Sequence, residues 1–324
     1  MSSQPRTAAA PAATAPTAGQ DLSREPSGAA AMPGGEAGEA VTGDVFAGTL
    51  AELTWYEVDR AARSGAVLLW AFGVIEQHGP HLPTGTDVYL PVARLRAVRA
   101  LLAERGVQAL VMPPYYWGVN VVSGSFPASY SVRPELMQEV MVDLLAGMAR
   151  DGFRHVFCFS GHGDALHNRT IHDGVRAARD RTPADASFVT EPALARRIGL
   201  DLDDPSLTLY GPDEPPPPGP ADVHAGRWET SLMMHSHPGL VREEVRARLE
   251  PSGLGASDLA VWRQGFDAAR RVTPDGYFGD PAAAGAGEGR RLHALAAEQA
   301  ADAIALRLRR PPPAQTAHPS RTED

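Results

Sequence analysis

Two short apolar runs, each followed at once by histidine and carboxylate residues, constrain the fold of this chain more than any other feature. The run at residues 66–73 precedes four side chains of types that bind metals: Glu76, His78, His81 and Asp87. The run at residues 155–160 precedes the sequence Gly-His-Gly-Asp, which contains His162 and Asp164. An unbroken apolar run of this length indicates a strand buried on both faces, and open α/β sheets carry their chemistry where such strands end.

Apolar residues at helical spacing between and beyond these runs predict an alternation of strands and helices. We expect helices at residues 88–105, 134–152, 168–181, 192–198 and 288–309, and further strands at 107–113 and 187–190. The spacing predicts one buried face made of Leu136, Val140, Leu144, Leu145 and Met148, and another made of Leu292, Leu295, Ala296, Ala303 and Leu306. Because parallel strands need a crossover that covers the sheet, this order predicts one α/β domain at residues 45–310, a three-layer α/β/α fold with a mostly parallel sheet.

The overall composition excludes several classes of protein. A net charge of -9 and a pI near 5.7 argue against a nucleic-acid surface or a basic membrane anchor, since either needs clustered Lys and Arg. A small-molecule substrate fits this charge better. The only cysteine, Cys158, rules out an intrachain disulfide and a cysteine-built metal site, and its apolar surroundings indicate a buried core residue.

The segments that flank and interrupt the predicted domain carry little periodic signal. Residues 1–44 are rich in Ala, Pro and Gly and predict disorder, as does the polar tail at 311–324. Neither a signal-peptide core nor an apolar run of about 18 residues occurs, so we expect a cytoplasmic protein that does not cross a membrane. Residues 201–220 are rich in turn formers, and residues 251–289 are irregular or weakly helical, with no chemistry assigned to them.

A third segment, residues 224–231, adds His224 and Glu229 to the candidate metal ligands that follow the two apolar runs. The ends of parallel strands meet at one edge of the sheet, so the first two groups converge there and the third can reach them. Imidazole and carboxylate without thiolate suit Zn, Mn or Fe, and several carboxylates can bridge two ions. Taken singly, each histidine is more often an ordinary hydrogen-bonded loop residue, but three clusters together favour a metal site.

The sequences of these segments resemble the motifs of the creatininase family of metal-dependent amidohydrolases. The pattern E-Q-H-G-P-H-L-P-x-x-x-D at residues 76–87 is similar to the first motif of that family, and G-H-G at 161–163 is similar to its second. H-A-G-x-x-E-T-S at residues 224–231 is similar to its third, and S-F-P at 125–127 resembles the F-P-G loop, with Ala128 in place of the glycine. Three ordered motifs form a specific signal.

The resemblance implies an α/β/α enzyme with two divalent metal ions per subunit, assembled into a homo-oligomer such as a hexamer. It implies that Glu76 and His162 hold one ion, that His78 holds the other, and that Asp87 bridges both. Asp164 stands where creatininase has a glutamate ligand and many relatives have glycine, so it is either a ligand or a supporting residue. The implied reaction is hydrolysis of a carbon-nitrogen bond, other than a peptide bond, in a small cyclic or linear amide.

Metal-assisted amide hydrolysis needs an activated water and a proton for the leaving nitrogen. We expect His224 to supply the proton, and Glu229 to orient a ligand histidine or to bind metal. We predict that four residues contact the substrate: Trp117, Ser123, Asp222 and His167. Creatinine is disfavoured as the substrate, because Pro220 and Ala221 replace the Trp-Asp pair that grips it in creatininase.

Other interpretations of the same residues stay open. The same site can act on a ring ketone or on a short peptide, as other members of the family do. Tyr115, Tyr116 and Trp117 can line the substrate site or belong to the core, since aromatic residues after a strand do both. The altered second motif also allows a non-catalytic binding protein.

Overall fold

The computed structural model describes residues 44–213 and 221–309. The segments predicted to be disordered, 1–44 and 311–324, therefore lie outside the described residues except for Asp44.

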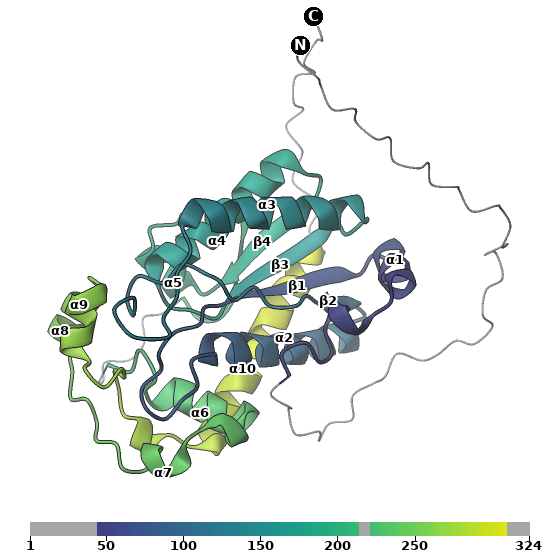
Figure 1. Ribbon diagram of the computed structural model, residues 1–324. Coiled ribbons are helices and arrows are strands. Elements are labelled where there is room, and N and C mark those ends of the chain that lie inside the picture. The colour runs from purple at the N-terminus through teal and green to yellow at the C-terminus, as the bar shows by residue number, and fades with distance from the viewer. Residues whose placement is uncertain (1–43, 214–220, 310–324) are drawn as a thin grey trace, which may run out of the picture. The chain divides into compact units, whose positions relative to one another are not determined.

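A five-stranded parallel sheet forms the centre of the domain (Figure 1). Its strands are β1 (Val67–Phe72), β2 (Ala109–Val111), β3 (His155–Ser160), β4 (Asp185–Thr190) and β5 (Leu207–Leu209). They lie in the order β2-β1-β3-β4-β5, and all four pairings are parallel. The two strands that precede the ligand motifs, β1 and β3, are thus neighbours in the middle of the sheet, with Phe72 opposite Ser160 at their carboxyl ends.

Helices cover both faces of this sheet. The longer ones are α2 (Thr86–Glu104), α3 (Pro134–Arg150), α4 (Ala165–Arg181) and α10 (Ala286–Leu308). The shorter ones are α1 (Trp55–Arg63), α5 (Pro192–Arg197), α6 (Arg227–Ser236), α7 (Glu243–Arg246), α8 (Ala256–Trp262) and α9 (Phe266–Val272). Short 3-10 turns lie at Leu50–Glu52, Pro238–Leu240 and Pro281–Ala283.

The side chains of β1 alternate between two hydrophobic cores. Leu68, Trp70 and Phe72 pack with α1, α3 and α4 on one face of the sheet, and Leu69 and Ala71 pack with α2 and α10 on the other. Figure 1 shows these helices in layers on either side of the strands. All six residues of β1 are buried, as an apolar strand covered on both faces should be. The predicted three-layer α/β/α domain with a parallel sheet is confirmed.

Several local predictions were wrong. Helix α2 begins two residues earlier than predicted, so Asp87 lies in its first turn rather than in the preceding loop. Helix α4 begins at Ala165, with Asp164 as its N-cap, and the turn-rich segment before residue 214 contains β5. The segment 251–289, predicted to be irregular or weakly helical, does contain two short helices, α8 and α9.

The buried faces of two helices also differ from the predicted ones. On α3, Leu145 and Met148 are buried as predicted, but Leu136 and Leu144 are exposed and Met137 and Met141 point into the core. On α10 the buried positions are mostly alanines, because this helix lies close to its neighbours and leaves no room for larger side chains. Leu295 and Leu306 are 56% and 55% exposed. A Cβ added at Gly289 would lie 1.8 Å from the carbonyl oxygen of Ser231 on α6. Among the described helices, none combines the length and the apolar character needed to cross a bilayer.

Candidate metal centre

Glycines at the ends of β1 and β3 bring the ligand-bearing segments together. A Cβ at Gly73 would lie 2.2 Å from the carbonyl oxygen of Asp87, and a Cβ at Gly161 would lie 2.3 Å from the same atom. Only glycine permits this approach, so the first turn of α2 lies directly against the ends of both strands. The backbone of Gly161 also donates a hydrogen bond to the carbonyl of Phe72. The sequence thus fixes Asp87 between the two strand ends.

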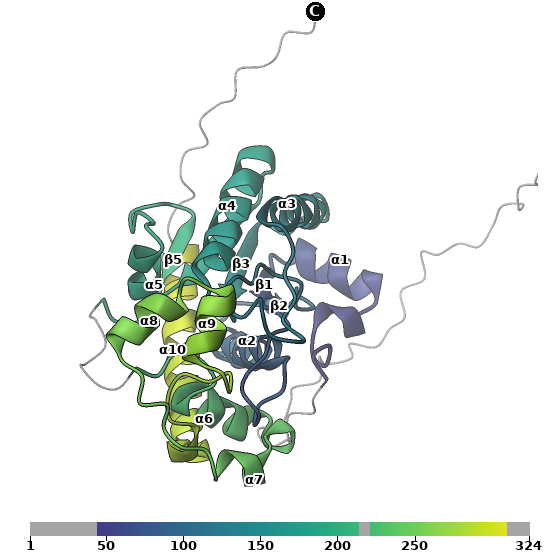
Figure 2. The ribbon, with the colours of Figure 1, turned by 60° about the vertical axis from the view of Figure 1, so that its left-hand side comes forward.

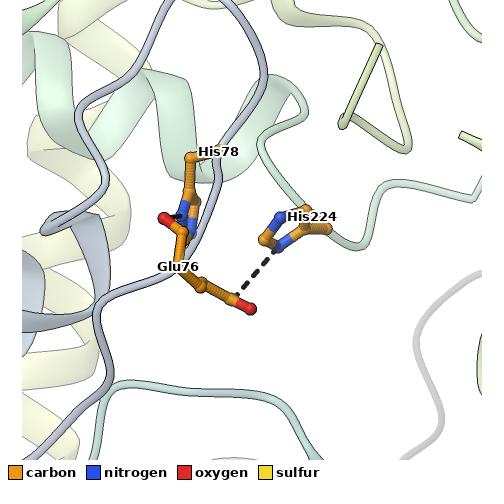
Figure 3. A group of neighbouring side chains, drawn as sticks. All are labelled: Glu76, His78 and His224. Atoms are coloured by element: carbon orange, nitrogen blue, oxygen red, sulfur yellow. Dashed lines mark hydrogen bonds and ion pairs between the residues drawn. The ribbon is translucent and has the colours of Figure 1, made fainter. Parts of the chain in front are cut away.

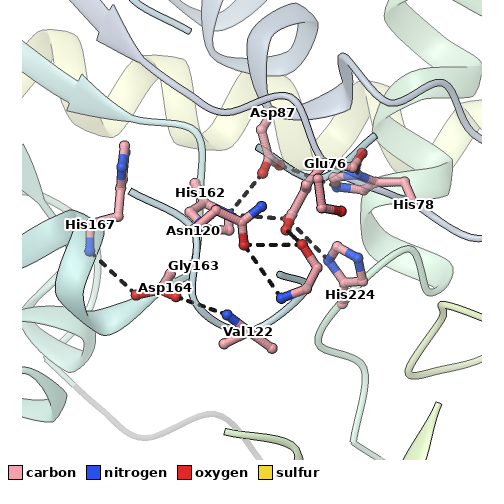
Figure 4. Close-up of polar contacts among 12 residues, drawn as sticks. Glu76, His78, Asp87, Asn120, Val122, His162, Gly163, Asp164, His167 and His224 are labelled. Atoms are coloured by element: carbon pink, nitrogen blue, oxygen red, sulfur yellow. Dashed lines mark hydrogen bonds and ion pairs between the residues drawn. The ribbon is translucent and has the colours of Figure 1, made fainter. Parts of the chain in front are cut away.

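Three carboxylates and three histidines converge at this edge of the sheet. Figure 4 shows five of these residues: Glu76, Asp87, His78, His162 and His224. Asp87 lies between two histidines, with Oδ1 3.2 Å from His78 Nε2 and Oδ2 2.8 Å from His162 Nδ1. Glu76 Oε1 lies 3.1 Å from His162 Nδ1 and 3.7 Å from His224 Nδ1, and Glu229 Oε2 lies 3.7 Å from His78 Nε2. Figure 3 shows Glu76, His78 and His224 close to one another.

Backbone carbonyls orient the histidine rings. His78 Nδ1 lies 3.2 Å from the carbonyl of Glu76, and His224 Nε2 lies 2.8 Å from the carbonyl of Gln77. A nitrogen that donates to a carbonyl leaves the other ring nitrogen with a free lone pair, which is the usual arrangement of metal-binding histidines. The other two ring nitrogens, His78 Nε2 and His224 Nδ1, both face the carboxylates and are the atoms that a metal ion would bind.

The buried carboxylates of the cluster stabilise positively charged groups beside them. Burial alone would lower the pKa of His78, but the carboxylates of Asp87, Glu229 and Glu76 outweigh burial and raise it to about 10. Burial alone would raise the pKa of Asp87, and the two neighbouring histidines hold it well below its usual range instead. Burial also raises the pKa of Glu229, to about 7. Buried carboxylates that shift their neighbours in this way form a site that attracts cations.

The geometry fits a divalent metal ion. Among the described residues, three groups bring ligand atoms within 4.8 Å of one another: Glu76 with His78 and His224, Glu76 with Asp87 and His162, and His78 with Asp87 and Glu229. His78 Nε2 is buried without a hydrogen bond, although two carboxylate oxygens lie nearby. Nitrogen and oxygen ligands without sulfur suit Zn or Mn.

Asp164 belongs to none of these three groups. Its Oδ1 accepts hydrogen bonds from the backbone of Leu166 and His167 at the start of α4, and its Oδ2 accepts from the backbone of Val121 and Val122. The carboxylate, 5% exposed, therefore joins the N-terminus of α4 to the long loop after β2. A metal ion at Asp164 would compete with four backbone donors.

Of the four residues predicted to contact the substrate, three make hydrogen bonds within the protein, and their contact with substrate stays a prediction. His167 is fully buried, and its Nδ1 accepts a hydrogen bond from the backbone of Val119. Asp222 accepts from the first two N–H groups of α6, those of Arg227 and Trp228. The hydroxyl of Ser123 donates to Glu76 Oε2, one of the candidate ligand carboxylates.

The fourth, Trp117, is 48% exposed and lies beside Tyr116 and Tyr130, with ring centroids at 5.1 and 6.4 Å. It is therefore a surface residue of the long loop and not part of the core. Its predicted contact with substrate stays a prediction.

Two residues near the cluster were missed from the sequence. Asn120 is buried, and its Oδ1 accepts hydrogen bonds from both the backbone and the hydroxyl of Ser123, which in turn orients Glu76. Trp262 lies 5.7 Å from the ring of His224. The proximity of Asn120 to the second ligand motif could have been suspected from its position after β2, but no local pattern marks Trp262.

Two known proteins are similar to this chain in sequence over more than half of its length. The mycofactocin precursor peptide peptidase of Mycobacterium ulcerans (strain Agy99) is 29% identical over 242 residues, which cover 74% of this chain and 84% of that protein. The creatinine amidohydrolase of Pseudomonas putida is 29% identical over 219 residues, which cover 61% of this chain and 74% of that protein.

Solved structures of creatininase share the fold. One of creatinine amidohydrolase has a TM-score of 0.61 at 25% identity and covers 82% of this chain and 99% of its own. Another, a point mutant described as the Zn-Zn type, has a TM-score of 0.60 at 25% identity, covering 79% and 96%.

The fold and the site define a class: α/β proteins that gather metal-type ligands where the central strands of a parallel sheet end. A family model described as creatinine amidohydrolase matches residues 51–304. The chain belongs to the creatininase family and is a hydrolase of that family.

Proposed function

We propose that the protein is a metal-dependent amidohydrolase that cleaves a carbon-nitrogen bond in a small cyclic or linear amide. One observation carries the proposal: Asp87 belongs both to the group with Glu76 and His162 and to the group with His78 and Glu229. A carboxylate shared by two ligand groups is the arrangement that a pair of bridged ions requires. The Zn-Zn form of the similar creatininase supports two ions of this kind.

In this proposal Glu76 and His162 would hold one ion, His78 would hold the other, and Asp87 would contribute a ligand to both. Divalent ions there would supply an activated water near neutral pH and would polarise the carbonyl of the substrate. Glu229, which accepts a hydrogen bond from the backbone of Ala225 at 2.6 Å, orients His78 or joins its ligand set. Asp164 takes no part in metal binding and holds the loop that carries Ser123.

We place the transfer of a proton to the leaving nitrogen on His224 at the edge of the cluster. Burial lowers the pKa of this histidine to about 4, so its neutral ring would take a proton from the attacking water and pass it to the leaving nitrogen. Its Nδ1 faces Glu76, and its backbone pairs with that of Phe278, whose N–H donates to the carbonyl of His224 at 2.7 Å. This pairing fixes the backbone from which the ring projects. A group held this way transfers a proton without a search through orientations.

A short peptide is the second candidate substrate. The similar mycofactocin precursor peptide peptidase aligns over 84% of its own length, and Pro220 and Ala221 replace the Trp-Asp pair with which creatininase grips creatinine. Both features favour a substrate other than creatinine. As before, we expect a cytoplasmic homo-oligomer, and a hexamer by the same resemblance.

Metal analysis paired with a substrate screen tests the proposal. Protein from medium supplemented with Zn and Mn should contain about two ions per chain. It should hydrolyse a member of a panel of lactams, formamides, short peptides and cyclic ketones, with products identified by mass spectrometry. Absence of bound metal sinks the proposal. Turnover that a His224→Ala variant loses excludes the non-catalytic interpretation, and a cyclic ketone as the only substrate redirects the reaction to carbon-carbon bonds.

A further inference from the structure

The hairpin formed by α8 and α9, residues 256–272, packs against His224 of the candidate metal centre and against the loop that carries Ser123. The two short helices lie next to each other beside the rest of the domain (Figure 2). This segment carries none of the three ligand motifs, and none of the proposed metal ligands or catalytic groups comes from it.

The first contact is made by Trp262 at the end of α8. Its side chain is 8% exposed, and its ring centroid lies 5.7 Å from that of His224 with 43° between the ring planes. The indole N–H donates to the hydroxyl of Thr273 at 3.1 Å, and the ring of Phe278 meets the indole edge-on at 5.9 Å. A hydrogen bond and an aromatic contact thus fix the rotation of the indole.

The ring of His224 lies between fixed groups. The ring of His78 is 4.3 Å away, and Nε2 bonds to the carbonyl of Gln77. Trp262 is the further aromatic ring packed near His224, at 5.7 Å between centroids. A shorter side chain at position 262 would leave space into which His224 can rotate, which would turn Nδ1 away from Glu76.

The second contact is made by the turn between α8 and α9. The backbone N–H of Phe266 donates to the carbonyl of Val121, and a Cβ at Gly124 would lie 2.7 Å from the ring of Phe266. Phe266 has a φ of +47°, a strained conformation for a bulky residue that persists only where the surroundings determine it. The same loop carries Ser123, whose hydroxyl donates to Glu76.

We propose that the α8–α9 hairpin is a positioning element of the active site, in which Trp262 holds the ring of His224 with Nδ1 toward Glu76. The inference rests on the proposed function, because it gives His224 a role that requires one orientation. Trp262 is a positioning residue and need not touch substrate. The hairpin, through Phe266, holds the Ser123 loop at the same time.

Two measurements test the role of Trp262, and the first does not depend on activity. Protein loaded with Co²⁺ is treated with diethyl pyrocarbonate, and modified histidines are mapped by mass spectrometry. His224, which is 6% exposed, should react several-fold faster in Trp262→Leu than in the wild type, with His162 unchanged. Trp262→Phe, which retains an aromatic ring, should stay close to the wild type. Trp228→Phe, a change at an exposed tryptophan, is the matched control.

The second measurement uses whichever member of the substrate panel is turned over. For Trp262→Leu we expect kcat to fall roughly 10 to 100-fold, with KM and Co²⁺ content within about 3-fold of the wild type. Trp262→Phe should recover most of kcat. A general loss of structure would instead lower the metal content and the thermal stability and raise KM. That result would overturn a positioning role.

The outcomes separate this inference from the proposed function. Wild-type protein that neither binds Co²⁺ nor turns over any substrate contradicts the proposed function. Wild-type protein that does both, while Trp262→Leu matches it in kcat and in His224 reactivity, overturns the role of Trp262. Should Trp262→Leu not fold, Thr273→Val removes the acceptor of the indole N–H at nearly constant volume, and the same two measurements decide.

Discussion

Asp87 and Asp164 lie at equivalent places in the fold, but Asp87 faces histidine side chains and Asp164 binds backbone N–H groups. Each is a buried aspartate at the start of a helix that follows a central strand, 2% and 5% exposed. The oxygens of Asp87 face the ring nitrogens of His78 and His162, whereas those of Asp164 accept four backbone N–H groups. A carboxylate at a strand end is therefore available to a metal only where the backbone does not already occupy its lone pairs.

The strongest way to break this comparison is to change Asp87. Asp87→Asn keeps the volume but replaces one oxygen by an NH₂ group that cannot bind a cation. We expect loss of at least one ion per chain and a fall in kcat/KM of about a thousandfold or more, because the shared ligand of both groups is removed. Metal content by mass spectrometry, with turnover of the panel substrate, gives the result. Full metal content in this variant would contradict a bridging role.

Asp164→Ala should act on stability instead of metal binding. It removes the cap of α4 and leaves the N–H groups of Val121 and Val122 without their acceptor, so we expect the free energy of unfolding to fall by roughly 3 to 4 kcal/mol. Urea denaturation measures this loss, and metal content should stay near the wild-type value. Asp164→Asn, which can still cap the helix, is the matched control and should lose less. Loss of metal without loss of stability would restore Asp164 as a ligand.

Gly161→Ala tests how the two strand ends are brought together. The added Cβ would lie 2.3 Å from the carbonyl oxygen of Asp87, an atom of the backbone that cannot move without the start of α2. We expect the free energy of unfolding to fall by about 2 to 3 kcal/mol, the usual range for overpacking, and metal affinity to weaken with it. Denaturation and a Zn²⁺ titration measure the two effects. An unchanged Zn²⁺ affinity would show that Asp87 does not depend on this close approach.

The sequence predicted the neighbours of Asp87 better than those of Asp164, and the reason is physical. Glu76, His78 and Asp87 are close in the chain, and they meet His162 because neighbouring parallel strands end together. The cap at Asp164 depends on a loop that returns from the end of β2, and no spacing within the second motif reveals it. Trp262 is further removed still, since its contact with His224 joins two segments that have no shared periodicity.

The packing faces of the helices show the same limit. A pattern of apolar residues predicted that Leu295 and Leu306 of α10 are buried, but alanines such as Ala300 and Ala301 occupy the close contact instead. How near a helix lies to its neighbours decides whether leucine or alanine fits between them, and that distance is a property of the whole fold.

Asp185, at the opposite end of the sheet from the ligand cluster, adds a third kind of partner to the comparison. Its carboxylate pairs with Arg179, with Arg307 at 2.8 Å and with His155 at 3.4 Å. Burial alone would raise its pKa, but these three residues outweigh burial and hold the pKa well below its usual range. Asp185→Asn should lower the free energy of unfolding by about 1 to 2 kcal/mol at pH 7.

The pH dependence of Asp185 has a definite sign. Because its folded pKa lies below the unfolded value of about 3.9, the stabilisation is complete above roughly pH 5 and is lost as the pH falls toward the folded pKa. The difference in unfolding free energy between the wild type and Asp185→Asn should therefore shrink between pH 6 and pH 3.5. A difference that stays constant over this range would show that the ion pairs do not stabilise the fold.

The smallest effect is expected at Gly163, the second glycine of the same Gly-His-Gly sequence. A Cβ at Gly163 meets nothing within 4 Å in the described part of the chain, and its φ lies outside the left-handed region. Gly163→Ala should therefore change the free energy of unfolding by no more than about 0.5 kcal/mol and leave metal content unchanged. Since the substitution is the same as at Gly161, the pair separates close packing against α2 from any general intolerance of this turn. If both variants lose stability equally, the 2.3 Å approach to the carbonyl of Asp87 is not the reason that position 161 requires glycine.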